Sequence, residues 1–209
     1  MNHEDVRNEA VGRGRQLEYL TVGWNILEGL IAVGSGLVVG SIALVGFGID
    51  SMIEVSSGAV LLWRLVRDRD LEHREKVEAV SLKLVGGCFL ALAVYVGYEA
   101  VTSLFRREAP EASYVGIGLA VVSLIVMPIL ARAKRRVASQ IGSHALEADS
   151  RQTDFCAYLS AILLVGLLLN ALFGWWWADP AVALVMTPVI GKEGIEALQG
   201  KRCMDENCH

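Results

Sequence analysis

Apolar residues fill six long stretches of the chain, and most charged residues lie between these stretches or at the two ends. A helix needs roughly 20 mostly apolar residues to cross the hydrocarbon core of a bilayer, and each stretch is about that long or longer. The stretches are 17–39, 42–65, 79–105, 113–132, 150–175 and 179–199. The pattern therefore predicts an all-α polytopic membrane protein with six transmembrane helices.

The composition supports a membrane protein and leaves little room for a soluble domain. Of the 209 residues, 54% are apolar and 20% are charged, which is too apolar for an ordinary soluble domain. We expect one transmembrane domain over 17–199, an N-terminal segment over 1–16 and a short tail over 200–209. Neither end is long enough to bury a hydrophobic core of its own.

Lysine and arginine residues are distributed unevenly among the connections. They are concentrated in the N-terminal segment, in the connections "RDRDLEHREK" and "ARAKRRVASQ", and in the tail, whereas the connection after the third stretch contains only Arg106 and Arg107. Connections rich in Lys and Arg stay on the cytoplasmic side of a membrane. The distribution therefore predicts that both termini are cytoplasmic, in a cell or inner membrane.

Two acids lie near the middle of the second stretch, in "GSIALVGFGIDSMIEVSSGAVLLW". Asp50 and Glu54 are four residues apart, so on a helix they occupy one face, one turn apart. An ionised carboxylate at that depth is costly unless something compensates for it, and such a residue is by default a candidate functional group. The pair is either half of a cation site or two neutral acids that bond neighbouring helices.

Further oxygen and sulfur ligands occur in two other stretches. Glu28 lies about 11 residues from the outer end of the first stretch, close to the expected depth of the acid pair. In the fifth, Asp149, Gln152 and Cys156 follow at spacings of three and four, on one stripe of a helix. Asp154 lies on a different stripe, at the cytoplasmic entrance or against a neighbouring helix, and is the alternative to Gln152 or Cys156.

This set of donors indicates a particular class of metal. A thiolate together with carboxylates and an amide oxygen is a mixed soft and hard set, which suits zinc or cadmium and suits magnesium poorly. Glu28 has a specific alternative role to metal binding: a protonated Glu28 could instead form a hydrogen bond with the backbone of a helix. The residues expected to bind metal are Asp50, Glu54, Gln152, Cys156, Glu28 and Asp149, with Asp154 as the less favoured substitute.

The run "GSIALVGFGIDSMIE", with Asn25 fifteen residues before its first glycine, resembles the first two helices of the cation diffusion facilitator family. The segments "SHALEAD" and "WADPAVAL" extend the resemblance to the approach to the fifth helix and the start of the sixth. The resemblance implies a transport domain over 17–199 that exports a divalent cation, zinc or a related metal, in exchange for protons. It also implies a homodimer.

The sequence departs from the family pattern in two places. The family's fifth helix usually contributes a histidine and, four residues later, an aspartate, whereas the same positions here are Gln152 and Cys156. The family's cytoplasmic domain, which typically follows the sixth helix, has no counterpart in the tail, so we expect a short member of the family. The tail ends in "CMDENCH", either a solvated end or a segment that captures metal for delivery.

Proton coupling follows from the chemistry of the ligands. Burial without a cation favours the neutral form of a carboxyl group, and a bound divalent ion favours the ionised form, so metal and proton compete for one site. Gln152 does not titrate near neutral pH. We therefore assign proton exchange to Asp50, Glu54 and Glu28, with Cys156 as a further candidate.

Other classes of function remain as alternatives or lack support. The same helices could form a metal sensor or a membrane protein that modulates a partner, binding an ion without transporting it. An enzyme has no support, because the sequence shows neither a nucleophile beside a base nor a phosphate-binding loop. We therefore expect no enzymatic activity, no cofactor and no nucleic-acid partner; the expected partners are a divalent metal ion, the bilayer and a second copy of the chain.

Overall fold

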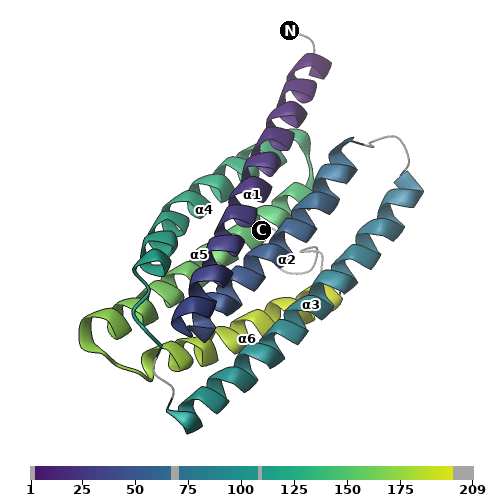
Figure 1. The fold of residues 1–209 in the computed structure, drawn as a ribbon. Coiled ribbons are helices and arrows are strands. Elements are labelled where there is room, and N and C mark those ends of the chain that lie inside the picture. The colour runs from purple at the N-terminus through teal and green to yellow at the C-terminus, as the bar shows by residue number, and fades with distance from the viewer. Residues whose placement is uncertain (1–2, 67–70, 108–109, 200–209) are drawn as a thin grey trace, which may run out of the picture.

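The computed structural model describes residues 3–66, 71–107 and 110–199, which form a bundle of helices without strands in these ranges (Figure 1). The helices are α1 (His3–Val39), α2 (Ile42–Val66), α3 (Leu71–Arg106), α4 (Tyr114–Ile141), α5 (His144–Phe173) and α6 (Ala178–Leu198). Five contain segments long and apolar enough to cross a membrane: Glu9–Val39, Ile42–Leu62, Gly86–Arg106, Tyr114–Ile141 and Asp149–Phe173. The all-α polytopic prediction is confirmed, and a sixth span over α6 stays a prediction.

The helices extend beyond the predicted stretches at several ends. α1 begins at His3 and α3 at Leu71, so both continue into sequence that was expected to lie outside the membrane-spanning part. The predicted division at residue 17 therefore does not correspond to a break in the first helix. The predicted tail over 200–209, with its cysteines and histidine, lies outside the described residues.

The largest difference concerns "ARAKRRVASQ", which was predicted to be a polar connection and instead forms the end of α4. Its small and apolar residues recur at helical spacing and are buried, as Ala131 and Ala138 show. Arg132, Arg135 and Arg136 are exposed on the other faces of the same turns. The charges obscured an amphipathic helical pattern in this segment.

Glycine and serine mark the ends of the central helices. Gly142 and Gly174 follow α4 and α5 with φ of 63° and 65°, the left-handed backbone that glycine adopts without penalty. Ser113 then caps α4, because its side chain accepts a hydrogen bond from the Gly116 N–H at 3.0 Å. Ser143 caps α5 in the same way. These residues set where α4 and α5 begin and end.

The helices pack most extensively in the pairs α1–α2, α3–α6 and α4–α5. Figure 1 shows α3 beside α6 at one edge of the bundle, away from α1 and α4. Close approach of α3 and α6 depends on glycine: a Cβ at Gly86 would lie 2.8 Å from the Gly194 carbonyl oxygen, whereas one at Gly87 would meet nothing within 4 Å. The absence of a side chain is therefore required for close packing at Gly86 but not at Gly87.

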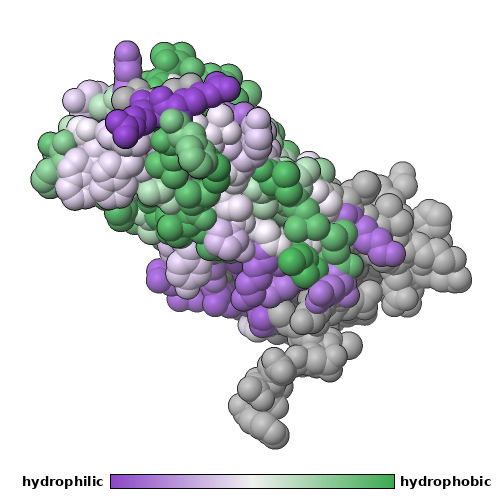
Figure 2. Space-filling view, turned by 90° about the horizontal axis from the view of Figure 1, so that it is seen from below, coloured by the Kyte–Doolittle hydropathy of each residue, from purple (hydrophilic) through white to green (hydrophobic). Residues whose placement is uncertain are grey.

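Many large apolar side chains are exposed on the outer surface of the bundle. Phe47, Phe89 and Met127 are buried in the core, whereas Val94 and Leu172 expose 73% and 72% of their surface. Figure 2 shows wide areas of apolar side chains on the face seen from below, with hydrophilic side chains in smaller groups. Such a surface suits contact with lipid chains, which do not penalise exposed apolar groups.

One polar contact joins α6 to the start of α2. The Asp179 carboxylate accepts hydrogen bonds from the Ser41 hydroxyl and from the backbone N–H of Ile42, the latter at 2.9 Å. A backbone N–H in the first turn of a helix has no partner within that helix. Asp179 therefore caps α2 from a helix that lies more than 130 residues further along the chain.

Candidate metal-binding site

Three helices bring four of the predicted ligands into one buried neighbourhood. Glu28 comes from α1, Asp50 and Glu54 come from α2, and Cys156 comes from α5; each exposes 3% or less of its surface. We call these four side chains the acid–thiol cluster. Their helices are far apart in sequence, so the tertiary packing brings them together.

Two contacts define the centre of the acid–thiol cluster. The Ser51 hydroxyl donates a hydrogen bond to Glu28 Oε2 at 3.0 Å, and the Cys156 thiol lies 3.8 Å from the same oxygen. Asp50 interacts electrostatically with both Glu54 and Glu28, and Cys156 interacts with all three acids. The cluster therefore links α1, α2 and α5 through ionisable groups.

Several oxygens of the cluster lack hydrogen-bond partners among the residues that the structure describes. They are Glu28 Oε1, Asp50 Oδ1 and both carboxylate oxygens of Glu54, all of them buried. Buried polar atoms almost always have partners, and an unsatisfied one costs free energy. A cation among these oxygens would satisfy them.

The side chains of the acid–thiol cluster are not arranged as a complete metal-coordination sphere. Within 3–66, 71–107 and 110–199, no three His, Cys, Asp or Glu side chains already form a group that could hold a metal ion. The four groups share a neighbourhood, and binding requires their side chains to close further around an ion. Metal ligation by Glu28, Asp50, Glu54 and Cys156 therefore stays a prediction.

The remaining predicted ligands lie in different surroundings. Gln152 is partly buried, and its Nε2 has no hydrogen-bond partner among the described residues. Asp149 is buried but forms an ion pair with Lys134 of α4. Asp154 is partly exposed and forms an ion pair with Arg135. The structure thus places both aspartates against cations of α4, and their roles as ligands remain untested predictions.

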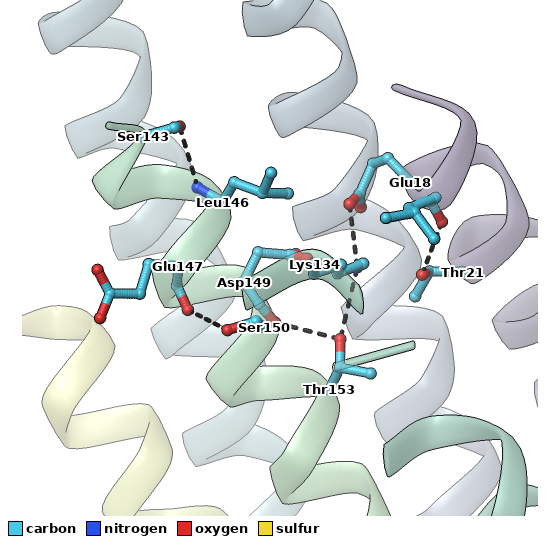
Figure 3. Close-up of polar contacts among 10 residues, drawn as sticks. Glu18, Thr21, Lys134, Ser143, Leu146, Glu147, Asp149, Ser150 and Thr153 are labelled. Carbon is cyan, nitrogen blue, oxygen red and sulfur yellow. Dashed lines mark hydrogen bonds and ion pairs between the residues drawn. The ribbon is translucent and has the colours of Figure 1, made fainter. Parts of the chain in front are cut away.

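Sequence reasoning missed two buried charges beside this site. Lys134, counted above among the cytoplasmic loop cations, is buried inside the bundle together with Glu18 of α1. Its Nζ lies 3.0 Å from Glu18 Oε2, and Figure 3 shows the ammonium group between Glu18 on one side and Asp149 and Thr153 on the other. The helical spacing of Ala131, Lys134 and Ala138 was the signal that could have indicated burial.

Buried acids and a thiol between membrane-spanning helices are typical of membrane proteins that bind or transport ions. The chain belongs to the cation efflux family, because the model of the cation efflux transmembrane domain matches residues 20–199. This confirms the resemblance stated from the sequence. The family consists of cation transporters and is not an enzyme class.

Individual relatives are similar over most of the chain but are longer. An uncharacterized transporter of Synechocystis is 27% identical over 176 residues, covering 81% of this chain and 57% of the relative. An uncharacterized transporter of Methanocaldococcus jannaschii is 28% identical, covering 83% and 63%. The cation-efflux pump FieF of Shewanella oneidensis is 29% identical over 118 residues, covering 56% and 38%. The chain thus spans about 57–63% of the length of the first two relatives.

Proposed function

We propose that this bundle exports a divalent transition-metal ion, zinc or cadmium, from the cytoplasm in exchange for protons. The observation that carries the proposal is the acid–thiol cluster, in which Glu28, Asp50, Glu54 and Cys156 are buried together. Membership of the cation efflux family supports the direction of transport, and the name of the relative FieF, a cation-efflux pump, agrees with it.

The chemistry of the cluster supports a metal of intermediate softness. Carboxylate oxygens bind hard cations, whereas a thiolate favours zinc and softer ions. The thiol of Cys156 lies within 3.8 Å of Glu28 Oε2, so one ion could contact both groups after a small movement. Magnesium and calcium, which prefer oxygen ligands alone, suit this pair poorly.

Proton exchange follows from the number of acids in one buried place. Three carboxyl groups and a thiol without a cation cannot all be ionised close together at low dielectric, so some carry protons. A divalent ion that binds there displaces those protons. Movement of the helices between inward-facing and outward-facing arrangements would then couple metal exit to proton entry.

The test is metal flux in proteoliposomes that contain a zinc-sensitive dye and a pH-sensitive dye. With an acidic lumen, externally added zinc should enter while the lumen becomes more alkaline, and empty liposomes should show neither change. Tight zinc binding by the purified protein without flux would overturn the proposal and favour the alternative function of a metal sensor. The homodimer and the cytoplasmic position of both termini stay predictions.

A further inference from the structure

A buried cluster of three charges lies beside the acid–thiol cluster. Lys134 of α4 contacts Glu18 of α1 and Asp149 of α5, and the exposed fractions of the three side chains are 0%, 0% and 6% (Figure 3). Lys134 Nζ also lies 3.5 Å from the Thr153 hydroxyl. We call Glu18, Lys134 and Asp149 the charge triad.

Burial of the triad costs free energy, so each of its charged groups depends on its partners. Removal of charged groups from water is expensive, and loss of one partner leaves another charge buried without compensation. The triad joins α1 to the α4–α5 pair, although residues 18 and 134 are distant in sequence. It therefore holds three helices together at one level of the bundle.

The triad lies between the acid–thiol cluster and the α4–α5 turn. Along α5, Asp149, Thr153 and Cys156 follow at helical spacing on one stripe, and seven residues correspond to about 10 Å along the axis. Glu54 interacts electrostatically with Lys134 and with Asp149. The triad therefore lies at a level of the bundle between its α4–α5 end and Cys156.

The charges of the triad suit a displaceable closure. Two carboxyl groups offer oxygen ligands to a cation, while the ammonium group of Lys134 already occupies the space between them. An entering divalent ion competes with Lys134 for Asp149 and Glu18. Release of Lys134 would remove the ion pairs that join α1 to α4 and α4 to α5 at this level of the bundle.

We propose that the charge triad closes the pathway between the acid–thiol cluster and the α4–α5 end of the bundle, and that the arriving metal ion displaces the ammonium group of Lys134. The proposal rests on the proposed transport function for the identity of the displacing ion. The closure itself is a property of the protein without metal and can be measured without transport.

The experiment uses Cys156 as the probe, because it lies beyond the triad and exposes only 1% of its surface. In a background of Cys88→Ser, Cys203→Ser and Cys208→Ser, the rate of Cys156 modification by N-ethylmaleimide is measured in detergent without metal. Lys134→Met should raise this rate at least several-fold. Lys192→Met, which removes an exposed lysine of α6, is the matched control and should leave the rate unchanged.

Two further variants distinguish misfolding from loss of the closure as the cause of faster Cys156 modification. The combination Glu18→Gln, Lys134→Met, Asp149→Asn leaves no uncompensated charge, so it should fold, elute as the wild type does in size-exclusion chromatography and still react fast. Gly86→Ala, which we expect to weaken the α3–α6 contact, should keep the slow rate despite reduced stability. Slow modification in the well-folded triple variant would overturn the closure.

The outcome for the closure is independent of the outcome for transport. Fast modification in the Lys134 variants together with absence of zinc flux in the wild type would support the closure and refute the proposed function. Unchanged modification together with normal zinc flux would refute the closure alone. In the same three-serine background with Lys134 unchanged, zinc should protect Cys156 from modification, and it should lose this ability when Asp50→Asn is introduced, which links the probe to the acid–thiol cluster.

Discussion

The thiol of Cys156 on α5 lies 3.8 Å from Glu28 Oε2 on α1, although 128 residues separate the two in the chain. The contact brings a soft donor and a hard donor together in the interior of the bundle. Ser51 of α2 bonds the same oxygen, so three helices meet at one carboxylate.

Asp50→Asn should nearly abolish zinc flux and leave the fold intact. The change removes one negative charge of the acid–thiol cluster but keeps the size of a side chain that is buried. Glu54→Gln should have the same effect or weaken zinc affinity. Flux in proteoliposomes and elution in size-exclusion chromatography are the measurements, and normal flux in a well-expressed Asp50→Asn protein would exclude Asp50 from the site.

Cys156→Ser should reduce affinity for cadmium more than affinity for zinc. A thiolate contributes more to the binding of the softer metal, and the hydroxyl group is a poor replacement. Cys156→Asp should retain zinc transport because it restores the residue that the family usually has at this position. Isothermal titration with the two metals measures the preference, and Cys88→Ser, at an exposed cysteine, is the control. An unchanged preference between cadmium and zinc would exclude Cys156 as a ligand and favour Asp154 in its place.

Glu28→Gln should weaken zinc binding roughly tenfold or more, since loss of a ligand or of a group that orients one usually costs that much. Glu28 is fully buried, contacts both Ser51 and Cys156, and has one oxygen without a partner among the described residues. The matched control is Glu99→Gln on α3, an acid in an apolar helix that is only partly buried. Equal zinc affinity in the two variants would leave Glu28 with a structural role.

Gly86→Ala should destabilise the bundle, whereas Gly87→Ala should not. A methyl group at Gly86 would lie 2.8 Å from the Gly194 carbonyl oxygen and 2.9 Å from the Leu198 backbone nitrogen, neither of which can rotate away. Overpacking of this kind costs about 1–3 kcal/mol. Thermal unfolding in detergent measures the difference between the two variants. Equal melting temperatures would mean that α3 and α6 separate more easily than their close contact implies.

The sequence by itself determined the class of structure and part of the site. Apolar stretches of spanning length specify helices, because every backbone polar group must be satisfied within a segment that lies in lipid. The spacing of Asp50 and Glu54 placed both on one face of one helix before any packing was known. The depth of Glu28, counted from the turn near Gly40, placed it level with them, and the structure brings all three into one neighbourhood.

Only the tertiary structure decided which charges pair across helices. Lys134 belongs to a run of basic residues whose charges predict a solvated connection, and Asp149 lies on the same stripe as Cys156, so local spacing gave no indication that Lys134 and Asp149 form an ion pair. Burial of Lys134 depends on Glu18, which approaches only because α1 packs against α4. An ammonium group enters the interior only where carboxylates meet it, and that meeting is a property of the folded bundle rather than of any single helix.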